Sequence, residues 1–391
     1  MKGKVLFISN TAIFSRFNLP FMRWFRQQGW QVDYVSDGEI QIPDCDNQYA
    51  IPIKRSPYNF KNLTAYKELK KILMNNYDII HCHTPMGGVL GRLATKNVNT
   101  KAVVIYTAHG FHFCKGAPLI NWFMYYPIEK YFAKYTDVLL TINEEDYAIA
   151  RKKFLVCNDI FKVDGVGVDL SRFYPYSADK KLQVRRELGY DKDDYIITNV
   201  AEITKNKNQY MLIKSLAELK KSIPTLKVLF IGNDNYSTEK KRLKLLIKKN
   251  KVQDFIQFLG YRHDVDKLTA ISNIAFSASI REGLPVNIIE AMACGIPIVC
   301  KRNRGHNSLI IDGKSGLLFS STTEMINSIL KIYKSECFAD NLSKNAIQCS
   351  KKYSRELIIE KMAKIYEQCM QRKNNDSNIL GYYLSSLGNL P

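Results

Sequence analysis

The chain has 391 residues, 46% of them hydrophobic, and its 57 lysines and arginines against 37 aspartates and glutamates give a net charge of +20. That length is too great for one ordinary core and predicts two globular domains. No apolar run approaches the roughly eighteen residues of a membrane-spanning helix, and the short run after the first four residues is not a signal peptide, so we expect a cytoplasmic protein.

The positive charge indicates an anionic partner, which is a membrane surface, a nucleic acid or a phosphorylated substrate. A solvated, lysine-rich surface accounts for part of the same excess. The nine cysteines are scattered without paired spacing, so no disulfides are expected.

Strands and helices alternate from the start of the chain, with short apolar runs predicting strands and longer amphipathic stretches predicting helices. The strands predicted in the first half are Val5–Ser9, Val32–Ser36, Asp78–His83, Val103–Ala108, Val138–Ile142 and Phe161–Val168. The helices predicted between them are Phe14–Gln28, Leu63–Asn75, Met86–Lys96, Leu119–Tyr135 and Glu144–Phe154. Such repeated units predict a parallel sheet with helices on both faces.

A break with two glycines and a proline, Gly165-Val-Gly-Val-Asp-Leu-Ser-Arg-Phe-Tyr-Pro, precedes a second run of the same alternation. Its predicted strands are Ile196–Ala201, Val228–Gly232, Ile256–Gly260, Ile274–Ser279 and Ile298–Cys300. Its predicted helices are Gln209–Lys221, Glu239–Asn250, Val265–Ser272, Pro285–Cys294, Thr323–Tyr333 and Ala339–Lys352. We therefore expect domains at residues 1–175 and 176–354, a last amphipathic helix at 355–371, and a tail of undefined order at 372–391.

The stretch from Ser279 to Pro297 is the most informative part of the chain. Pro285 suits the first turn of a helix and Gly295 suits its end, so a helix follows the strand directly. Free backbone amides and the helix dipole make its amino terminus an anion site. Two carboxylates, Glu282 and Glu290, flank that terminus and are suited to accept hydrogen bonds from hydroxyls. A nucleotide sugar carries both phosphates and hydroxyls and meets both demands.

Glu282-x7-Glu290, inside Ser-x-x-Glu-Gly-x-Pro and followed by Glu-Ala-Met-Ala-Cys-Gly-x-Pro, resembles the donor-site signature of retaining GT-B glycosyltransferases of family 4. The relatives meant are those of capsular, exopolysaccharide or O-antigen synthesis. The resemblance covers nearly all of the chain to about residue 370. It implies an α/β fold with two Rossmann-like domains facing a cleft, and a C-terminal helix that crosses back to the N-terminal domain. The plain alternative is an ordinary strand–helix unit with a surface Glu282.

The resemblance also implies roles for particular residues. Glu282 would hold donor-sugar hydroxyls beside Gly283 and Leu284, and Glu290 would hold the ribose diol. Lys207 and Asn208 match the Lys-Asn of the family's donor loop, and the diphosphate role passes to Lys207. Two neighbouring residues, Tyr261 and Arg262, match a turn that contacts the nucleobase, and the choice of uracil follows from the resemblance alone.

Glu202 stands in the same loop where the family often has arginine. A carboxylate beside a diphosphate repels it, so Glu202 would pair with Lys205 or Lys207, or would contact a sugar or ribose hydroxyl.

The motif Thr107-Ala-His-Gly-Phe-His-Phe places His109 where the family has a histidine that reaches toward the donor sugar. A neutral imidazole donates to a hydroxyl, and a protonated one steadies a departing phosphate. His112 is a second candidate, and a turn histidine bonded to backbone is the plain alternative. His81 and His83 are two apart, but no Cys or carboxylate cluster accompanies them, so no metal site is predicted.

Aromatic and basic residues are interleaved in two parts of the first domain, the predicted helix Phe14–Gln28 and the segment Phe111–Tyr135. The first carries Phe17, Phe21, Trp24 and Phe25 with Arg16, Arg23 and Arg26, and the second region carries Trp122, Tyr125, Tyr126, Tyr131 and Phe132 with Lys115, Lys130 and Lys134. This mixture suits an anionic membrane interface. It is equally typical of helices whose aromatic faces cover a sheet.

Together these features predict a hexosyltransferase that moves an N-acetylhexosamine or hexose, with retention, from a UDP-sugar to a saccharide on polyprenyl diphosphate in bacterial surface polysaccharide assembly. The resemblance implies a front-face mechanism in which the donor's own phosphate takes the acceptor proton, while the protein orients and stabilises charge. We expect no metal or other cofactor, since no Asp-x-Asp motif lies in a suitable loop. The expected place is the inner face of the cell membrane.

Two alternatives stay open. A UDP-sugar epimerase of the same double fold would need no acceptor. A basic nucleic-acid-binding protein would explain the charge but gives no reason for Glu282 and Glu290, so nucleic acid is not expected as a partner.

Overall fold

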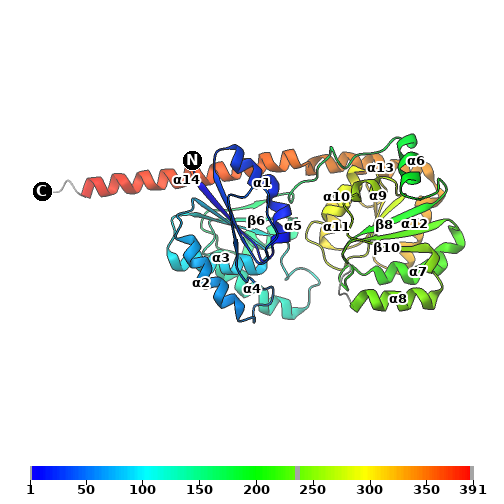
Figure 1. Ribbon diagram of the computed structural model, residues 1–391, viewed down its shortest axis with the longest axis horizontal. Helices are drawn as coiled ribbons and strands as arrows, with labels where there is room; N and C mark the ends of the chain where they lie inside the picture. The colour runs from blue at the N-terminus through cyan, green and yellow to red at the C-terminus, as the bar shows by residue number, and fades with distance from the viewer. Residues whose placement is uncertain (1, 234–237, 388–391) are drawn as a thin grey trace. The chain divides into compact units, whose positions relative to one another are not determined.

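The computed structural model describes residues 2–233 and 238–387, with side chains up to residue 372. Two compact units divide the chain: residues 1–166 with 356–391 form unit 1, and Gly167–Arg355 form unit 2. Each unit contains a parallel sheet flanked by helices, which confirms the predicted α/β class (Figure 1). All nine cysteines are free thiols, as predicted.

Unit 1 is built on a seven-stranded sheet in the order β3-β2-β1-β4-β5-β6-β7, with parallel neighbours throughout. Its strands are β1 (Lys4–Ile8), β2 (Gln31–Ser36), β3 (Asn47–Ala50), β4 (Ile79–His83), β5 (Val103–Ala108), β6 (Val138–Thr141) and β7 (Asp159–Lys162). Its helices before the last one are η1 (Ala12–Phe14), α1 (Ser15–Gln27), α2 (Lys61–Leu73), α3 (Pro85–Val98), α4 (Leu119–Ala133) and α5 (Glu144–Lys153). The strand order reverses between β1 and β4, and parallel sheets bind ligands at the carboxyl side of such a switch point.

Helix α3 lies very close to the sheet because its inner face carries glycine. A Cβ at Gly88 would lie 2.4 Å from the Tyr106 ring, and one at Gly91 would lie 2.4 Å from Cys82 Sγ. Larger residues at these positions would push the helix away from β4 and β5. The backbone at Thr84, just before α3, has a φ of 63°, which is unusual for a β-branched residue.

A buried ion pair joins α3 to α4. Arg92 is 1% exposed, its Nη2 donates to Glu129 Oε2 at 2.8 Å, and its Nε donates to the Gly88 carbonyl at 2.8 Å. Tyr106 Oη donates to the other Glu129 oxygen at 3.0 Å, and its ring centroid lies 3.9 Å from the Arg92 guanidinium carbon. Both charges are therefore paired and hydrogen-bonded, as buried charges must be.

Unit 2 is built on a six-stranded parallel sheet in the order β10-β9-β8-β11-β12-β13. Its strands are β8 (Tyr195–Val200), β9 (Leu226–Ile231), β10 (Ile256–Gly260), β11 (Ile274–Ser277), β12 (Ile298–Lys301) and β13 (Leu317–Phe319). Its helices are α6 (Ala178–Glu187), α7 (Gln209–Ser222), α8 (Thr238–Asn250), η2 (Gln253–Phe255), α9 (Val265–Ala270), α10 (Val286–Ala293), α11 (Arg304–Leu309), α12 (Thr322–Lys334), α13 (Glu336–Ser350) and η3 (Lys351–Tyr353). The switch point here lies between β8 and β11.

The sequence missed β3, α6, α11 and β13. The strand Asn47–Ala50 is polar and half exposed, and α6 buries only Val184 and Arg185, so neither shows an apolar period. The other two elements are six and three residues long. Strand β7 ends at Lys162, before the predicted Phe161–Val168 ends, because Gly165 and Gly167 turn the chain with φ of 79° and 76°.

The boundary between the units lies at Val166, nine residues before the predicted end of the first domain at residue 175. Val168 and Phe173 are 2% and 6% exposed and belong to the core of unit 2. The Val168 amide donates to the Tyr353 carbonyl at 2.8 Å, and the Arg355 amide donates to the Val168 carbonyl at 2.9 Å. These bonds tie both ends of unit 2 together.

Helix α14 (Arg355–Leu387) returns the chain to unit 1, as predicted, but it continues past the predicted end at residue 371. Tyr366, 1% exposed, packs 4.6 Å from the Phe25 ring and 5.8 Å from the Trp24 ring. Most of the predicted tail is thus helical backbone, and residues 388–391 lie outside the described residues. Among the described helices, none is long and apolar enough to cross a membrane.

The buried ion pair gives a stability prediction. Arg92→Leu should lower the free energy of unfolding by about 3–5 kcal/mol, because Glu129 would stay buried without its partner. The double variant Arg92→Leu with Glu129→Leu should recover much of that loss. Urea unfolding of the full chain measures both, with the exposed Arg151→Leu on α5 as the control. A double variant no more stable than the single one would contradict this account.

Candidate functional site

Three loops meet at the carboxyl edge of the unit 2 sheet, because β8, β11 and β12 are parallel neighbours. The loop after β8 and the loop after β11 are joined through Asn206. Its carbonyl accepts from the Ile280 amide at 2.8 Å, and its side-chain amide donates to the Arg281 carbonyl at 3.0 Å. The two loops that carry the predicted donor residues therefore form one rigid surface.

Lys207 and Glu282 face each other across these loops. Lys207 Nζ donates to Glu282 Oε1 at 2.7 Å, and the two side chains are 20% and 13% exposed. The ion pair neutralises a half-buried carboxylate and fixes the lysine at the same time. The sequence analysis offered Lys207 as one possible partner of Glu202. In the described chain Lys207 is bonded to Glu282 instead. Glu202 is exposed, and its carbonyl accepts from the Gln209 side chain at 3.0 Å.

The loop after β12 supports Glu282 from behind. A Cβ at Gly305 would lie 2.7 Å from Glu282 Cβ, so only glycine lets α11 approach this closely. Arg304 Nε donates to the Glu282 carbonyl at 3.1 Å, and the Asn303 side chain donates to the Ser279 carbonyl at 2.7 Å. Sequence reasoning did not assign these three residues. The only signal was an Asn-Arg-Gly segment after an apolar strand.

Helix α10 starts at Val286, with Pro285 as its cap, and carries no acidic residue in its first turn. Asn287 donates from its side chain to the Val200 carbonyl at 2.9 Å, which fixes the helix against the end of β8. The amino end of α10 thus lies at the same sheet edge as Lys207, next to Gly283 and Leu284 in the preceding loop. A cation and a helix amino terminus together suit a diphosphate.

Glu290 lies one turn into α10 and is half-buried. Burial raises the pKa of its carboxyl to about 7, Arg172 lowers it and Asp266 raises it. Arg172 is itself paired with Asp266 at 2.7 Å. In the part of the chain that the structure describes, no hydrogen bond reaches the Glu290 carboxylate, which leaves its oxygens able to accept from a ligand.

The remaining predicted donor residues are placed differently. Arg262 Nε and Nη2 donate to the two Asp264 oxygens at 2.8 and 2.6 Å, so its guanidinium is already occupied. Tyr261 is 55% exposed and packs edge-on against His263. Asn208 precedes α7 with a left-handed backbone φ of 53°, and its side-chain amide donates to the Ala278 carbonyl at 3.4 Å.

His109 lies directly after β5, beside His83, which ends β4, one of the two strands at the switch point of unit 1. His83 Nδ1 and His109 Nε2 are 3.1 Å apart. Burial lowers the pKa of His109 to about 4 and that of His81 to about 3, so both rings are neutral at pH 7. His112 lies apart from this contact, with its ring stacked 4.5 Å from that of Tyr125.

Among the side chains that the structure describes, no group of three His, Cys, Asp or Glu residues is placed to hold a metal ion. Both nitrogens of His81 are taken, by Tyr366 Oη at 2.8 Å and Thr107 Oγ1 at 2.7 Å.

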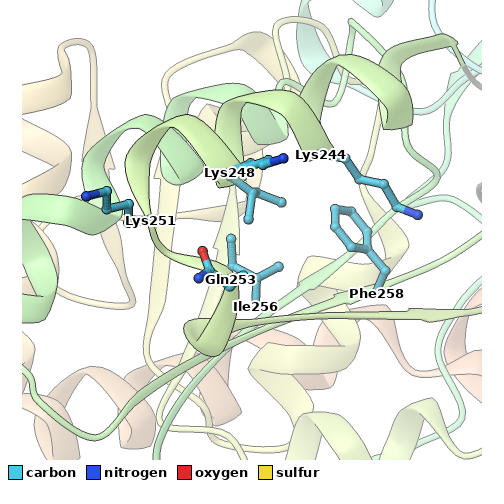
Figure 2. Close-up of a pocket in the computed structure, with 7 residues that line it drawn as sticks. Lys244, Lys248, Lys251, Gln253, Ile256 and Phe258 are labelled. Carbon is cyan, nitrogen blue, oxygen red and sulfur yellow. The ribbon is translucent and has the colours of Figure 1, made fainter.

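A basic pocket of about 370 Å³ lies elsewhere in unit 2, between α8 and the segment from η2 into β10. Figure 2 shows Lys244 and Lys248 on α8 facing Ile256 and Phe258 on β10. Strand β10 is separated from β11 by β9 and β8. The pocket is therefore distinct from the loops that carry Lys207 and Glu282.

Two protein-family models match the chain. The model described as glycosyl transferases group 1 covers residues 180–349, and the model described as glycosyl transferase 4-like covers residues 4–143. The first match lies within unit 2 and the second within unit 1.

Individual proteins agree with the family models. The chain is 37% identical over 384 residues to the putative glycosyltransferase EpsD of Bacillus subtilis, covering 97% of this chain and 100% of that protein. It is 29% identical over 327 residues to the UDP-Gal:alpha-D-GlcNAc-diphosphoundecaprenol alpha-1,3-galactosyltransferase of Escherichia coli, covering 78% of each. HepE of Anabaena, crystallised with UDP-glucose, has a TM-score of 0.78 at 16% identity over 94% of this chain and 100% of that chain. This likeness concerns the fold alone, and it confirms the predicted GT-B class.

The pKa of Glu290 gives a prediction. If its carboxylate accepts hydrogen bonds from a ribose diol, ligand binding lowers this pKa and releases a proton. Affinity for uridine should then rise from pH 6 toward pH 8, changing by at most about tenfold per pH unit below pH 7. Uridine is preferable to UDP because phosphate itself titrates near pH 6.

Calorimetry on the wild type and on Glu290→Gln measures this effect. The variant should bind uridine at least about tenfold more weakly at pH 8, because a charged hydrogen bond contributes roughly 1.5–3 kcal/mol, and it should show no such pH dependence. Equal affinities of the two proteins at pH 8 would remove Glu290 from the ribose site.

Proposed function

This chain belongs to the glycosyltransferases, and on that premise we propose that it transfers a sugar with retention from a UDP-sugar to a saccharide carried on a polyprenyl diphosphate. The sugar is an N-acetylhexosamine or a hexose, and the product belongs to a bacterial surface polysaccharide.

The observation that carries the donor side is the Lys207–Glu282 ion pair beside the amino end of α10. The diphosphate takes Lys207 and the helix terminus, which together balance its charge. Glu282 accepts hydrogen bonds from the donor-sugar hydroxyls, and Glu290 accepts them from the ribose. Charge stabilisation by these groups requires no metal ion, and the reaction should therefore proceed in the presence of a chelator.

The acceptor assignment is supported by the relatives. The Escherichia coli protein is named for an acceptor in which a sugar is linked to undecaprenol through a diphosphate. In a front-face mechanism the donor phosphate takes the proton of the acceptor hydroxyl. The protein then contributes orientation, with His109 donating a hydrogen bond to the donor sugar or to the departing phosphate.

The test is slow hydrolysis of a panel of UDP-sugars in EDTA, together with UDP and uridine binding. Lys207→Ala should weaken UDP binding at least about tenfold and leave uridine binding unchanged, because the diphosphate is the part of the ligand that we assign to the lysine. Lys205→Ala, an exposed lysine in the same loop, is the matched control and should change neither.

Three results would count against this function. Equal losses of uridine and UDP affinity in Lys207→Ala would remove the lysine from the phosphate site. Failure to bind or hydrolyse any UDP-sugar would exclude the donor class. Interconversion of a UDP-sugar without an acceptor would favour the epimerase alternative.

The proposal includes attachment to the inner face of the cell membrane, but not through all the aromatic residues that the sequence suggested. Phe25 is fully buried, and Trp122 is half-buried and donates to the Cys114 carbonyl at 3.3 Å. Arg23 and Arg26 are paired with Asp44 and Asp46. Phe25 and Trp122 therefore support the alternative in which the aromatic residues cover the sheet.

The start of α4 offers a better membrane contact. Leu119, Ile120 and Phe123 are 75%, 59% and 76% exposed, and Lys115 and Lys130 are exposed nearby in the sequence. Exposed apolar side chains with basic neighbours suit an anionic bilayer surface, where each basic residue contributes about 1 kcal/mol.

We expect Leu119→Ser with Phe123→Ser to weaken binding to anionic vesicles several-fold, and binding should fall as salt is raised. Phe60→Ser with Leu63→Ser removes two equally exposed apolar side chains from unit 1 and should leave binding unchanged. Co-sedimentation with phosphatidylglycerol and phosphatidylcholine vesicles decides it. Equal binding of both variants, or of both lipids, would place the membrane contact elsewhere or remove it.

A further inference from the structure

The proposed function uses His109 and leaves its neighbour His83 without a role. His83 is the last residue of β4, and His109 follows β5, the parallel neighbour of β4. Their rings meet through His83 Nδ1 and His109 Nε2 at 3.1 Å. The surroundings of the second nitrogen of each ring indicate which histidine donates the hydrogen bond.

The two outer nitrogens differ in their surroundings. In the described chain, His83 Nε2 is fully buried and has no hydrogen-bond partner. His109 Nδ1 also makes no hydrogen bond to a described residue, but unlike His83 Nε2 it is not fully buried. It therefore reaches the surface of unit 1, where a ligand can meet it.

Counting protons gives the direction of the hydrogen bond. Burial lowers the pKa of both rings, so each is neutral at pH 7 and carries one N–H. A His109 Nε2–H donor would force the His83 proton onto the buried Nε2, where nothing accepts it. A His83 Nδ1–H donor leaves only a bare nitrogen there. A buried N–H group without an acceptor is rarer and costlier than a buried acceptor atom without a donor.

We infer that His83 donates to His109 Nε2 and thereby fixes the tautomer in which His109 carries its proton on Nδ1, the nitrogen that faces the surface. His83 is thus a positioning residue, and this role in the reaction rests on the proposed function of His109. A donor at Nδ1 matches the lone pairs of a sugar hydroxyl or a phosphate oxygen. The other tautomer would place one lone pair against another.

The surroundings hold His83 in this orientation. Its ring centroid lies 4.0 Å from that of His81, and both nitrogens of His81 are bonded, to Tyr366 and Thr107. Phe14 also contacts both histidines, with its ring centroid 5.6 Å from that of His83 and 4.8 Å from that of His109. These ring contacts restrict the movement of His83 and His109.

Two substitutions separate the nitrogens of His83. The amide of His83→Asn lies near the position of Nδ1 and can replace the donor to His109. The amide of His83→Gln lies near the position of Nε2 and cannot. Both remove the imidazole from the same buried place, so a purely structural role predicts similar effects of the two.

The measurement is nitrogen-15 NMR of histidine-labelled full-length protein at neutral pH, with the His109 signals assigned through His109→Asn. We expect the Nδ1–H tautomer for His109 in the wild type and in His83→Asn, and loss of that tautomer in His83→Gln. UDP-sugar hydrolysis should stay within about threefold of wild type in His83→Asn and fall at least about tenfold in His83→Gln.

An Nε2–H tautomer of His109 in the wild type overturns the inference, even if neither variant folds. So does an unchanged tautomer in His83→Gln. The tautomer is read without turnover, so the two proposals fail separately. If the tautomer follows these expectations while His109→Asn hydrolyses UDP-sugars at the wild-type rate, the tautomer assignment stands and the proposed role of His109 fails.

Discussion

The ion pair between Lys207 and Glu282 is the constraint on which the candidate donor site depends. It joins the loops after β8 and β11, and each side chain needs the other, because a half-buried charge without a partner is costly. Gly305 and Arg304 bring α11 against the backbone of Glu282, so the carboxylate cannot withdraw. A ligand at this site would meet Lys207 and Glu282 in fixed positions. It would have to compete with the ion pair between them.

The sequence predicted the structure best where a residue type has a strong preference for one position, such as proline at the start of a helix and glycine at its end. A proline and a glycine bracket α10, and two glutamates flank its start, so the helix, its anion-binding end and the carboxylates were predicted together. The sequence did not show that Lys207 pairs with Glu282, because that contact depends on the order of β8 and β11 in the sheet. Periodicity identifies strands but does not reveal which of them are neighbours.

The same limit explains the residues that were missed. His83 was considered only as a metal ligand, since its spacing from His81 is visible in the sequence while its contact with His109 is not. Gly305 looks like an ordinary loop glycine until α11 is seen against Glu282. The membrane prediction from the aromatic residues of α1 and α4 met a different limit. Composition shows that Phe25 and Phe123 are apolar, but only packing shows that one is buried and the other exposed.

Helix α14 determines which of the two units has its complete sequence first during synthesis. Unit 2 is one continuous stretch, Gly167–Arg355, and all of it has been synthesised before α14 appears. Unit 1 is discontinuous: its sheet is made first, but Tyr366, which bonds His81 and packs against Phe25, follows the whole of unit 2. On the ribosome the second unit therefore has its complete sequence before the first, and His81 lacks its Tyr366 partner until α14 has been synthesised. A product that ended after Arg355 would contain every residue of the loops that carry Lys207 and Glu282, and would lack the hydrogen-bond partner of His81.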